Sequence, residues 1–327
     1  MGKKYDVLIT SELFQKAYDI LKDDCNLEIH KKDRPMTREE LENSIKNKDG
    51  ILTMLTERID QELIELNPDL KIIANCAVGY DNINIDACNK YNIKVSNTPD
   101  ILTNTTADFA WAMLMSLSRK VVEADKKVRN SGFNGWGLSD FLGTDINNKT
   151  LGIIGLGRIG QAVAKRAQGF NMNIIYNDVN RNKNLEEELN IEYKEFDGLL
   201  AESDYIIIFV PLLPSTKHLI GEEELDKMKD TAYLINIARG GIVDEKSLEK
   251  ALKTNQIAGA ALDVYENEPE VSNGLKELNN VILTPHIASA SKATREKMAE
   301  VAARNLLSGL KDQEVENIVN PEVLQEG

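Results

Sequence analysis

The sequence predicts an α/β protein built from two doubly wound domains with parallel sheets. Three observations lead to this expectation. A chain of 327 residues is longer than one ordinary hydrophobic core organises. Short apolar segments alternate with helical segments in both halves, as in parallel sheets that are buried on both faces. A glycine-rich motif follows the first apolar segment of the second half. We expect one domain from residues 1–100 plus 290–327, another from 101–289, and a ligand-binding cleft between them.

The first-half elements follow from local signals. Apolar runs predict strands, and Ser11 is expected to cap a helix that extends to about Asp23. Thr37 and Glu40 have the spacing of a capping box, which predicts a helix over about 38–47. The predicted strands of this half lie at 5–10, 51–55 and 72–76.

In the second half, apolar and small residues recur at helical spacing over about 103–129 and predict one long helix. The Gly- and Asn-rich segment 130–148 is expected to be a loop. A last helix over about 292–310 is expected to pack back on the first domain. The predicted strands lie at 151–154, 173–176, 205–210, 232–236, 258–262 and 281–283.

Composition narrows the function. The net charge of −14 disfavours binding to nucleic acid or to anionic membranes, which need a basic surface. Cys25, Cys76 and Cys88 have no C-x-x-C spacing, so we expect free thiols rather than a disulfide or a metal site. We find neither a signal peptide nor a run of about 18 apolar residues, and we therefore expect a cytoplasmic protein.

The glycine motif indicates a dinucleotide site. Gly155, Gly157 and Gly160 form G-x-G-x-x-G between a predicted strand and a predicted helix. The helix begins near Arg158 and Ile159, so its N–H groups would face a pyrophosphate. An isolated motif of this kind could also be a structural turn, and Arg158 could be a surface side chain.

Asp178 follows the glycines at about the distance expected for a carboxylate that binds the adenosine ribose, roughly 20 residues. A carboxylate there repels a 2′-phosphate and favours NAD, with NADH preferred over NADPH. Arg181 lies near enough in sequence to weaken that preference, and Asp178 could instead be a solvated turn residue.

Three polar residues follow three successive predicted strands: Arg239, Glu268 and His286. The carboxyl ends of parallel strands form the ligand-binding edge of such a sheet. Reduction of a 2-oxo acid needs a proton donor, for which histidine is suited, and a carboxylate partner stabilises the imidazolium. Arginine can bind the substrate carboxylate with two hydrogen bonds. Each residue also has a structural alternative. Arg239 could form a structural ion pair, Glu268 could be a surface acid, and His286 could be a buried histidine in a turn. His30 and His218 lack comparable surroundings.

The chain resembles the D-isomer-specific 2-hydroxyacid dehydrogenases over about residues 50–310, and within them the glyoxylate/hydroxypyruvate reductases. The matching segments are VGYDNI (78–83), TNTTADFAWAMLM (103–115), LGIIGLGRIG (151–160), VPLLPSTKHLI (210–220), NIARGGIVDEKSLEKAL (236–252), ALDVYENEP (261–269) and LTPHIASA (283–290). The resemblance implies a flavodoxin-like substrate domain and a Rossmann NAD-binding domain.

The resemblance also assigns roles to individual residues. His286 matches the acid/base histidine, Glu268 its partner, and Arg239 the substrate-binding arginine. It implies that backbone N–H groups at Val78 and Gly79 hold the substrate carboxylate. Trp136 lies in a loop that reaches toward the partner subunit in similar reductases, though it could instead only pack in the interface of the homodimer that the family implies. The residues implied to line the cofactor are Thr106, Pro211, Thr216, Ala238, Asp263 and Ser289.

The expected reaction is therefore NADH-dependent reduction of glyoxylate or hydroxypyruvate to the D-2-hydroxy acid. One alternative keeps the enzyme class with another substrate, such as D-lactate, 3-phosphoglycerate, formate or phosphite. Arg58 alone supplies a basic group in segment 52–58, which disfavours a phosphorylated substrate. Another alternative is a NAD-sensing protein without turnover, as in corepressors of this fold.

Overall fold

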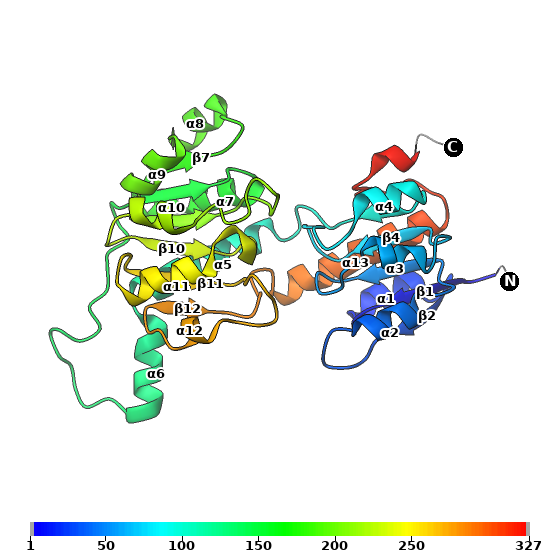
Figure 1. Ribbon diagram of the computed structural model, residues 1–327, viewed down its shortest axis with the longest axis horizontal. Coiled ribbons are helices and arrows are strands. Elements are labelled where there is room, and N and C mark those ends of the chain that lie inside the picture. The colour runs from blue at the N-terminus through cyan, green and yellow to red at the C-terminus, as the bar shows by residue number, and fades with distance from the viewer. Residues whose placement is uncertain (1–2, 325–327) are drawn as a thin grey trace. The chain divides into compact units, whose positions relative to one another are not determined.

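The computed structural model describes residues 3–324, and its chain divides into two compact units (Figure 1). The first contains the described residues of Met1–Leu102 and Ala290–Gly327, and the second contains Thr103–Ser289. In the described range, no helix is both long and apolar enough to cross a lipid bilayer.

The sheet of the first unit confirms the predicted fold class. Within the described residues it has five parallel strands in the order β2-β1-β3-β4-β5, which is the flavodoxin-like order. The predicted runs at 5–10, 51–55 and 72–76 correspond to three of them. The strands are β1 Tyr5–Ile9, β2 Cys25–Ile29, β3 Gly50–Thr53, β4 Ile72–Asn75 and β5 Lys94–Ser96.

Helices cover this sheet. They are α1 Gln15–Leu21, α2 Arg38–Ser44, α3 Gln61–Glu65, α4 Ile85–Lys90 and α13 Lys292–Leu310, and a 3-10 turn covers Pro321–Leu324. The capping box at Thr37 and Glu40 is confirmed, with both of its hydrogen bonds present. Ser11 is not an N-cap, because α1 begins four residues later and Phe14 occupies that position.

The last helix returns to the first unit. The alanine- and leucine-rich face of α13 joins the core formed by β1, β3, β4 and α1, and Figure 1 shows α13 (orange) among the blue and cyan elements. Ala302, Ala303 and Leu306 are almost completely buried there. Apolar burial of this kind is the main force that holds a distant segment of the chain in place.

The second unit contains, in its described residues, a parallel seven-stranded sheet in the order β12-β11-β10-β9-β6-β7-β8. Counted from β6, this is the Rossmann order with one further strand at the edge. The fold class is confirmed here too. The strands are β6 Thr150–Ile154, β7 Asn173–Asn177, β8 Glu192–Tyr193, β9 Tyr205–Ile208, β10 Tyr233–Asn236, β11 Gly259–Leu262 and β12 Val281–Leu283.

Two hydrophobic cores lie on opposite faces of this sheet. One contains residues of α5 and α7, and the other contains residues of α9, α10 and α11. The helices are α5 Thr103–Ser118, α6 Val121–Ser131, α7 Arg158–Ala167, α8 Lys183–Leu189, α9 Phe196–Glu202, α10 Glu222–Lys227, α11 Glu245–Lys253 and α12 Asn273–Lys276, with 3-10 turns at Gln168–Phe170 and Gly240–Ile242.

The single helix predicted over 103–129 is wrong, because α5 ends at Ser118 and α6 begins at Val121. Lys120 between them has a left-handed backbone, with φ of 51°. The carbonyl of Ser118 accepts a hydrogen bond from the Thr144 N–H at 2.9 Å. A tertiary contact therefore provides the hydrogen bond for a carbonyl at the end of α5. The next helix, α6, extends away from the sheet (Figure 1).

Candidate active site

The glycine loop between β6 and α7 has the geometry that a dinucleotide pyrophosphate needs. Gly155 has φ of +94°, which disfavours other residues, and a Cβ on Gly160 would lie 2.3 Å from the Gly155 carbonyl oxygen. A Cβ on Gly157 would meet no atom within 4 Å, so the backbone at the start of α7 is open to a ligand. These residues fit a dinucleotide phosphate.

Asp178 directly follows β7 and is held against the same loop. One carboxylate oxygen accepts the Leu156 N–H at 2.8 Å, and the other accepts the Asn180 N–H at 2.9 Å. Arg181 pairs with Glu186 at 2.9 Å and lies over the Tyr193 ring. The carboxylate therefore has a fixed place beside the glycine loop, and the nearby arginine is engaged with another acid.

The other residues expected to line the cofactor differ in their surroundings. Thr106 is buried in the first turn of α5, and its hydroxyl has no hydrogen-bond partner among the described residues. Thr216 donates to the Pro211 carbonyl at 2.6 Å, which closes that loop on itself. Ala238 and Ser289 are half-buried, and the Ala238 N–H donates to Asn236. The unpartnered hydroxyl of Thr106 fits a site for a polar ligand.

The structure brings His286 and Glu268 together. The His286 Nδ1 lies 2.8 Å from the Glu268 Oε2, and both side chains are about one-third exposed. The Tyr265 N–H donates to the other oxygen of Glu268 at 3.1 Å. The carboxylate thereby fixes the orientation of the imidazole ring.

The charges around Glu268 favour its ionised form. Burial alone would raise its pKa, but the hydrogen bond and charge of His286, the Tyr265 N–H and the charge of Arg239 together lower the pKa of Glu268 below its ordinary value. Arg239 is half-buried after β10 and donates one hydrogen bond to the Ala238 carbonyl. Glu268 is thus near enough to both His286 and Arg239 to interact with each of them electrostatically.

Asp263 organises the loop that carries His286. Its buried carboxylate accepts hydrogen bonds from the Thr284 hydroxyl at 2.6 Å, the Ile287 N–H at 2.8 Å and the Ala288 N–H at 2.8 Å. The Asp263 carbonyl also accepts the His286 N–H at 2.8 Å. His286 itself has a left-handed backbone, with φ of 53°. Asp263 therefore fixes an unusual conformation at the histidine.

The loops after β10 and β11 contact each other without side chains between them. A Cβ on Gly240 would lie 1.8 Å from the Tyr265 carbonyl carbon, so only glycine fits there. Glu245 and Glu266 exchange hydrogen bonds, each carboxylate accepting the other residue's N–H, at 2.6 and 2.8 Å. Sequence reasoning did not identify these contacts, although the Gly240-Gly241 pair beside Arg239 was a signal for a close backbone approach.

The other two histidines have different partners. His218 lies 3.3 Å from Glu266 and 3.8 Å from Asp244, and His30 contacts the Arg34 carbonyl. Among the described residues no group of three or more His, Cys, Asp or Glu side chains could hold a metal ion. Burial raises the pKa of the Cys25 thiol to about 11 and that of Cys88 to about 12, so neither thiol is activated.

Val78, Gly79 and Trp136 complete the predicted set. Val78 and Gly79 lie in the loop after β4 of the first unit, half-buried. Trp136 lies in the loop after α6 and is 80% exposed.

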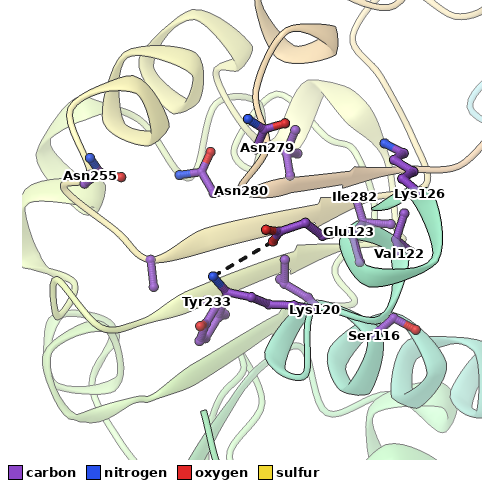
Figure 2. Close-up of a pocket in the computed structure, with 13 residues that line it drawn as sticks. Ser116, Lys120, Val122, Glu123, Lys126, Tyr233, Asn255, Asn279, Asn280 and Ile282 are labelled. Atoms are coloured by element: carbon purple, nitrogen blue, oxygen red, sulfur yellow. Dashed lines mark ion pairs between the residues drawn. The ribbon is translucent and has the colours of Figure 1, made fainter. Parts of the chain in front are cut away.

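A pocket elsewhere in the second unit is separate from the polar cluster (Figure 2). It is lined by residues of α5, α6 and the strand edge, among them Lys120, Glu123 and Tyr233. Arg239, Glu268 and His286 do not line it, and its one ion pair joins Lys120 to Glu123 at 3.9 Å. The chemistry of the strand ends, rather than this pocket, identifies the candidate active site.

Comparison with known proteins shows the family of the chain. Residues 111–288 match the NAD binding domain of the D-isomer specific 2-hydroxyacid dehydrogenases. The chain is 48% identical over 326 residues to a glyoxylate reductase of Pyrococcus horikoshii, covering 98% of each protein. It is 46% identical to a glyoxylate reductase of Thermococcus onnurineus, covering 98% of this chain and 97% of the relative.

Solved structures are similar over nearly the whole length. A glyoxylate reductase from Paecilomyes thermophila has a TM-score of 0.86 at 35% identity, covering 98% of this chain and all of the other. An NADPH-dependent glyoxylate/hydroxypyruvate reductase from Sinorhizobium meliloti, in complex with NADP and malonate, has a TM-score of 0.84 at 30% identity, covering 97% of each chain. The chain belongs to the D-isomer specific 2-hydroxyacid dehydrogenase family, and it is an oxidoreductase with an NAD-binding domain.

Proposed function

We propose that the protein reduces glyoxylate or hydroxypyruvate to the D-2-hydroxy acid with NADH. The observation that carries this proposal is the 2.8 Å contact of His286 with Glu268, beside the charge of Arg239. The relatives named glyoxylate reductase support the substrate class. The reaction needs an anion-binding group and a proton donor, and this cluster contains both.

The geometry suggests which atom moves the proton. Because Nδ1 of His286 is engaged with Glu268, Nε2 is the ring nitrogen that would face the substrate oxygen. The reduced nicotinamide, when bound, supplies the hydride. The imidazolium donates its Nε2 proton to the carbonyl oxygen, and in the reverse direction the neutral ring accepts it. Arg239 binds the substrate carboxylate, and so do the backbone N–H groups at Val78 and Gly79.

The preference for NADH rests on Asp178. Its carboxylate is fixed by the Leu156 N–H and would repel a 2′-phosphate, while Arg181 is paired with Glu186. The Sinorhizobium meliloti neighbour, by contrast, is NADPH-dependent and is in complex with NADP. The value of kcat/KM should be higher with NADH than with NADPH. The reverse order would remove Asp178 from this role.

The test of the substrate is a panel assayed with both cofactors. Glyoxylate and hydroxypyruvate should give the highest kcat/KM, above pyruvate and phosphorylated 2-oxo acids, and formate and phosphite should not be oxidised. A higher value for one of these would move the protein to another member of the enzyme class. Tight NADH binding without turnover of any substrate would instead indicate a NAD-sensing protein.

We also propose a homodimer. In the described range α6 buries none of its residues, and Val121 and Val128 are each about half exposed. The loop after it exposes Phe133, Trp136 and Leu138 by 72–80%. Such an apolar arm is typical of an interface. Sedimentation should give twice the chain mass of 36.5 kDa, and a monomer at micromolar concentration would contradict the proposal.

A further inference from the structure

Two asparagines hold the carbonyl groups of the loop that follows β4. The Asn97 side chain donates from Nδ2 to the Val78 carbonyl at 2.8 Å. The Asn75 side chain donates from Nδ2 to the next carbonyl, that of Gly79, also at 2.8 Å. Two consecutive peptide groups are therefore fixed by side chains rather than by strand or helix hydrogen bonds.

This arrangement sets the direction of two N–H groups. Both peptide bonds are trans, and in a trans peptide the N–H points away from the C=O. The Gly79 N–H thus points away from Asn97, and the Tyr80 N–H points away from Asn75. Across residues 3–324, neither N–H donates a hydrogen bond. Successive backbone N–H groups that are not used within the fold can bind an anion such as a carboxylate.

Asn75 is itself rigidly placed. It is the last residue of β4 and is fully buried. Its Nδ2 lies 3.5 Å from the Asn82 Oδ1, and Asn82 in turn donates to the carbonyls of Met54 and Glu57 at 3.1 and 3.0 Å. The loops after β3 and β4 are joined through this pair, which fixes where the Asn75 amide can donate.

Asn97 is held from the other side by the returning chain. Its N–H donates to the Asn317 carbonyl at 3.1 Å, and its carbonyl accepts from the Asn305 side chain of α13 at 3.1 Å. Asn305 is buried among the residues of the first unit. The C-terminal segment therefore sets the position of a side chain that orients the loop some 20 residues before it.

We propose that Asn75 and Asn97 are positioning residues that aim two N–H groups of this loop at the carboxylate of the substrate. Asn97 orients the Gly79 N–H, which the proposed function already uses, and Asn75 orients the Tyr80 N–H, which takes the place of the Val78 N–H. The inference rests on the proposed function, since it assumes that this loop binds a 2-oxo acid. Their loss should weaken binding of the carboxylate in ground state and transition state alike. The expected signature is a higher KM with little change in kcat.

Asn97→Ala and Asn75→Ala test this proposal, and Asn67→Ala is a matched control. Asn67 is a buried asparagine of the same unit, and it likewise donates to two backbone carbonyls, those of Ile45 and Lys48 at 2.9 and 2.8 Å. It lies outside the loop after β4. KM and kcat for glyoxylate, the Kd for NADH and the Kd for oxamate, a 2-oxo acid analogue that carries the same carboxylate, are measured for each protein.

Asn97→Ala and Asn75→Ala should each raise KM and the oxamate Kd about tenfold, with kcat within about twofold and NADH binding unchanged. Asn67→Ala should lower the melting temperature without raising KM. If both loop variants keep the wild-type KM, or raise it no more than Asn67→Ala, the inference is wrong. If Asn75→Ala fails to fold, the KM and the oxamate Kd of Asn97→Ala alone test the inference, since Asn97 is only half-buried. A wild-type protein that turns over no 2-oxo acid overturns the proposed function, and the inference with it.

Discussion

His286 is positioned by two carboxylates with separate tasks. Asp263 is buried and fixes the backbone on both sides of the histidine, and Glu268 is partly exposed and contacts the ring. Asp263 therefore fixes the conformation of the loop, and Glu268 fixes the orientation of the ring. Replacing Asp263 should disturb the fold of the loop, and replacing Glu268 should chiefly disturb the proton transfer that we propose.

Glu268→Gln should lower kcat/KM about 100-fold, because an amide cannot stabilise the imidazolium that the proposed reaction needs. The pKa of Glu268 is lowered in the folded protein, so its stabilising contribution is present above the ordinary value of 4.5. That contribution is lost as the pH falls through the lowered pKa. Thermal melting of both proteins at several pH values should show a difference that shrinks below pH 4.5. A constant difference would contradict the assigned ionisation.

Some site residues could be predicted from the sequence because they belong to a local motif or directly follow a predicted strand. Arg239, Glu268 and His286 each follow a predicted strand, and their proximity follows from the parallel sheet. Asn75 and Asn97 also lie at strand ends, yet an amide that donates to a carbonyl leaves no distinctive spacing. The bonds of Asn97 to Asn305 and Asn317 join segments about 200 residues apart, which local patterns cannot reveal.

The elements of the second unit meet where the loops after β10, β11 and β12 converge. Gly240 allows the arginine loop to approach the Tyr265 backbone, and the Glu245–Glu266 exchange joins the start of α11 to the loop that carries Glu268. Because these loops are closely packed, a small displacement of one loop moves the other. The spacing of Arg239 from Glu268 therefore depends on a contact in which neither side chain takes part.

Gly240→Ala should separate these loops, because its Cβ would overlap the Tyr265 backbone. We expect a loss of about 1–3 kcal/mol in the free energy of unfolding and a reduced kcat. Gly198→Ala is the control, since a Cβ at this position of α9 meets no atom within 4 Å and should stabilise the helix by about 0.5–1 kcal/mol. Chemical denaturation measures both. Equal stability of the two variants would contradict the close approach.

The break between α5 and α6 shows where sequence patterns fail at this scale. No glycine or proline lies between Ser116 and Val122, and the apolar periodicity continues through Lys120. The helix ends because Gly143 lets the returning chain approach the Ser118 carbonyl, where a Cβ would lie 2.3 Å away. Gly143 lies 143 − 118 = 25 residues after Ser118, so only the folded structure reveals this contact.

The whole chain combines two α/β units in which the last helix rejoins the first. The sheet orders, the cofactor loop and the matches over nearly the full length place it among the 2-hydroxyacid dehydrogenases. The alternation of strands and helices was sufficient to predict this architecture. The preferred 2-oxo acid depends on side-chain contacts with a substrate, which alternation does not encode.

In the proposed reaction His286 transfers the proton. The most direct test of this step is steady-state oxidation of NADH with glyoxylate by the wild-type protein and by His286→Ala, with NADH binding measured for both. We expect turnover by the wild type and a loss of about 100- to 10,000-fold in kcat for the variant, at unchanged NADH affinity. A folded His286→Ala protein that keeps nearly full turnover would contradict this expectation.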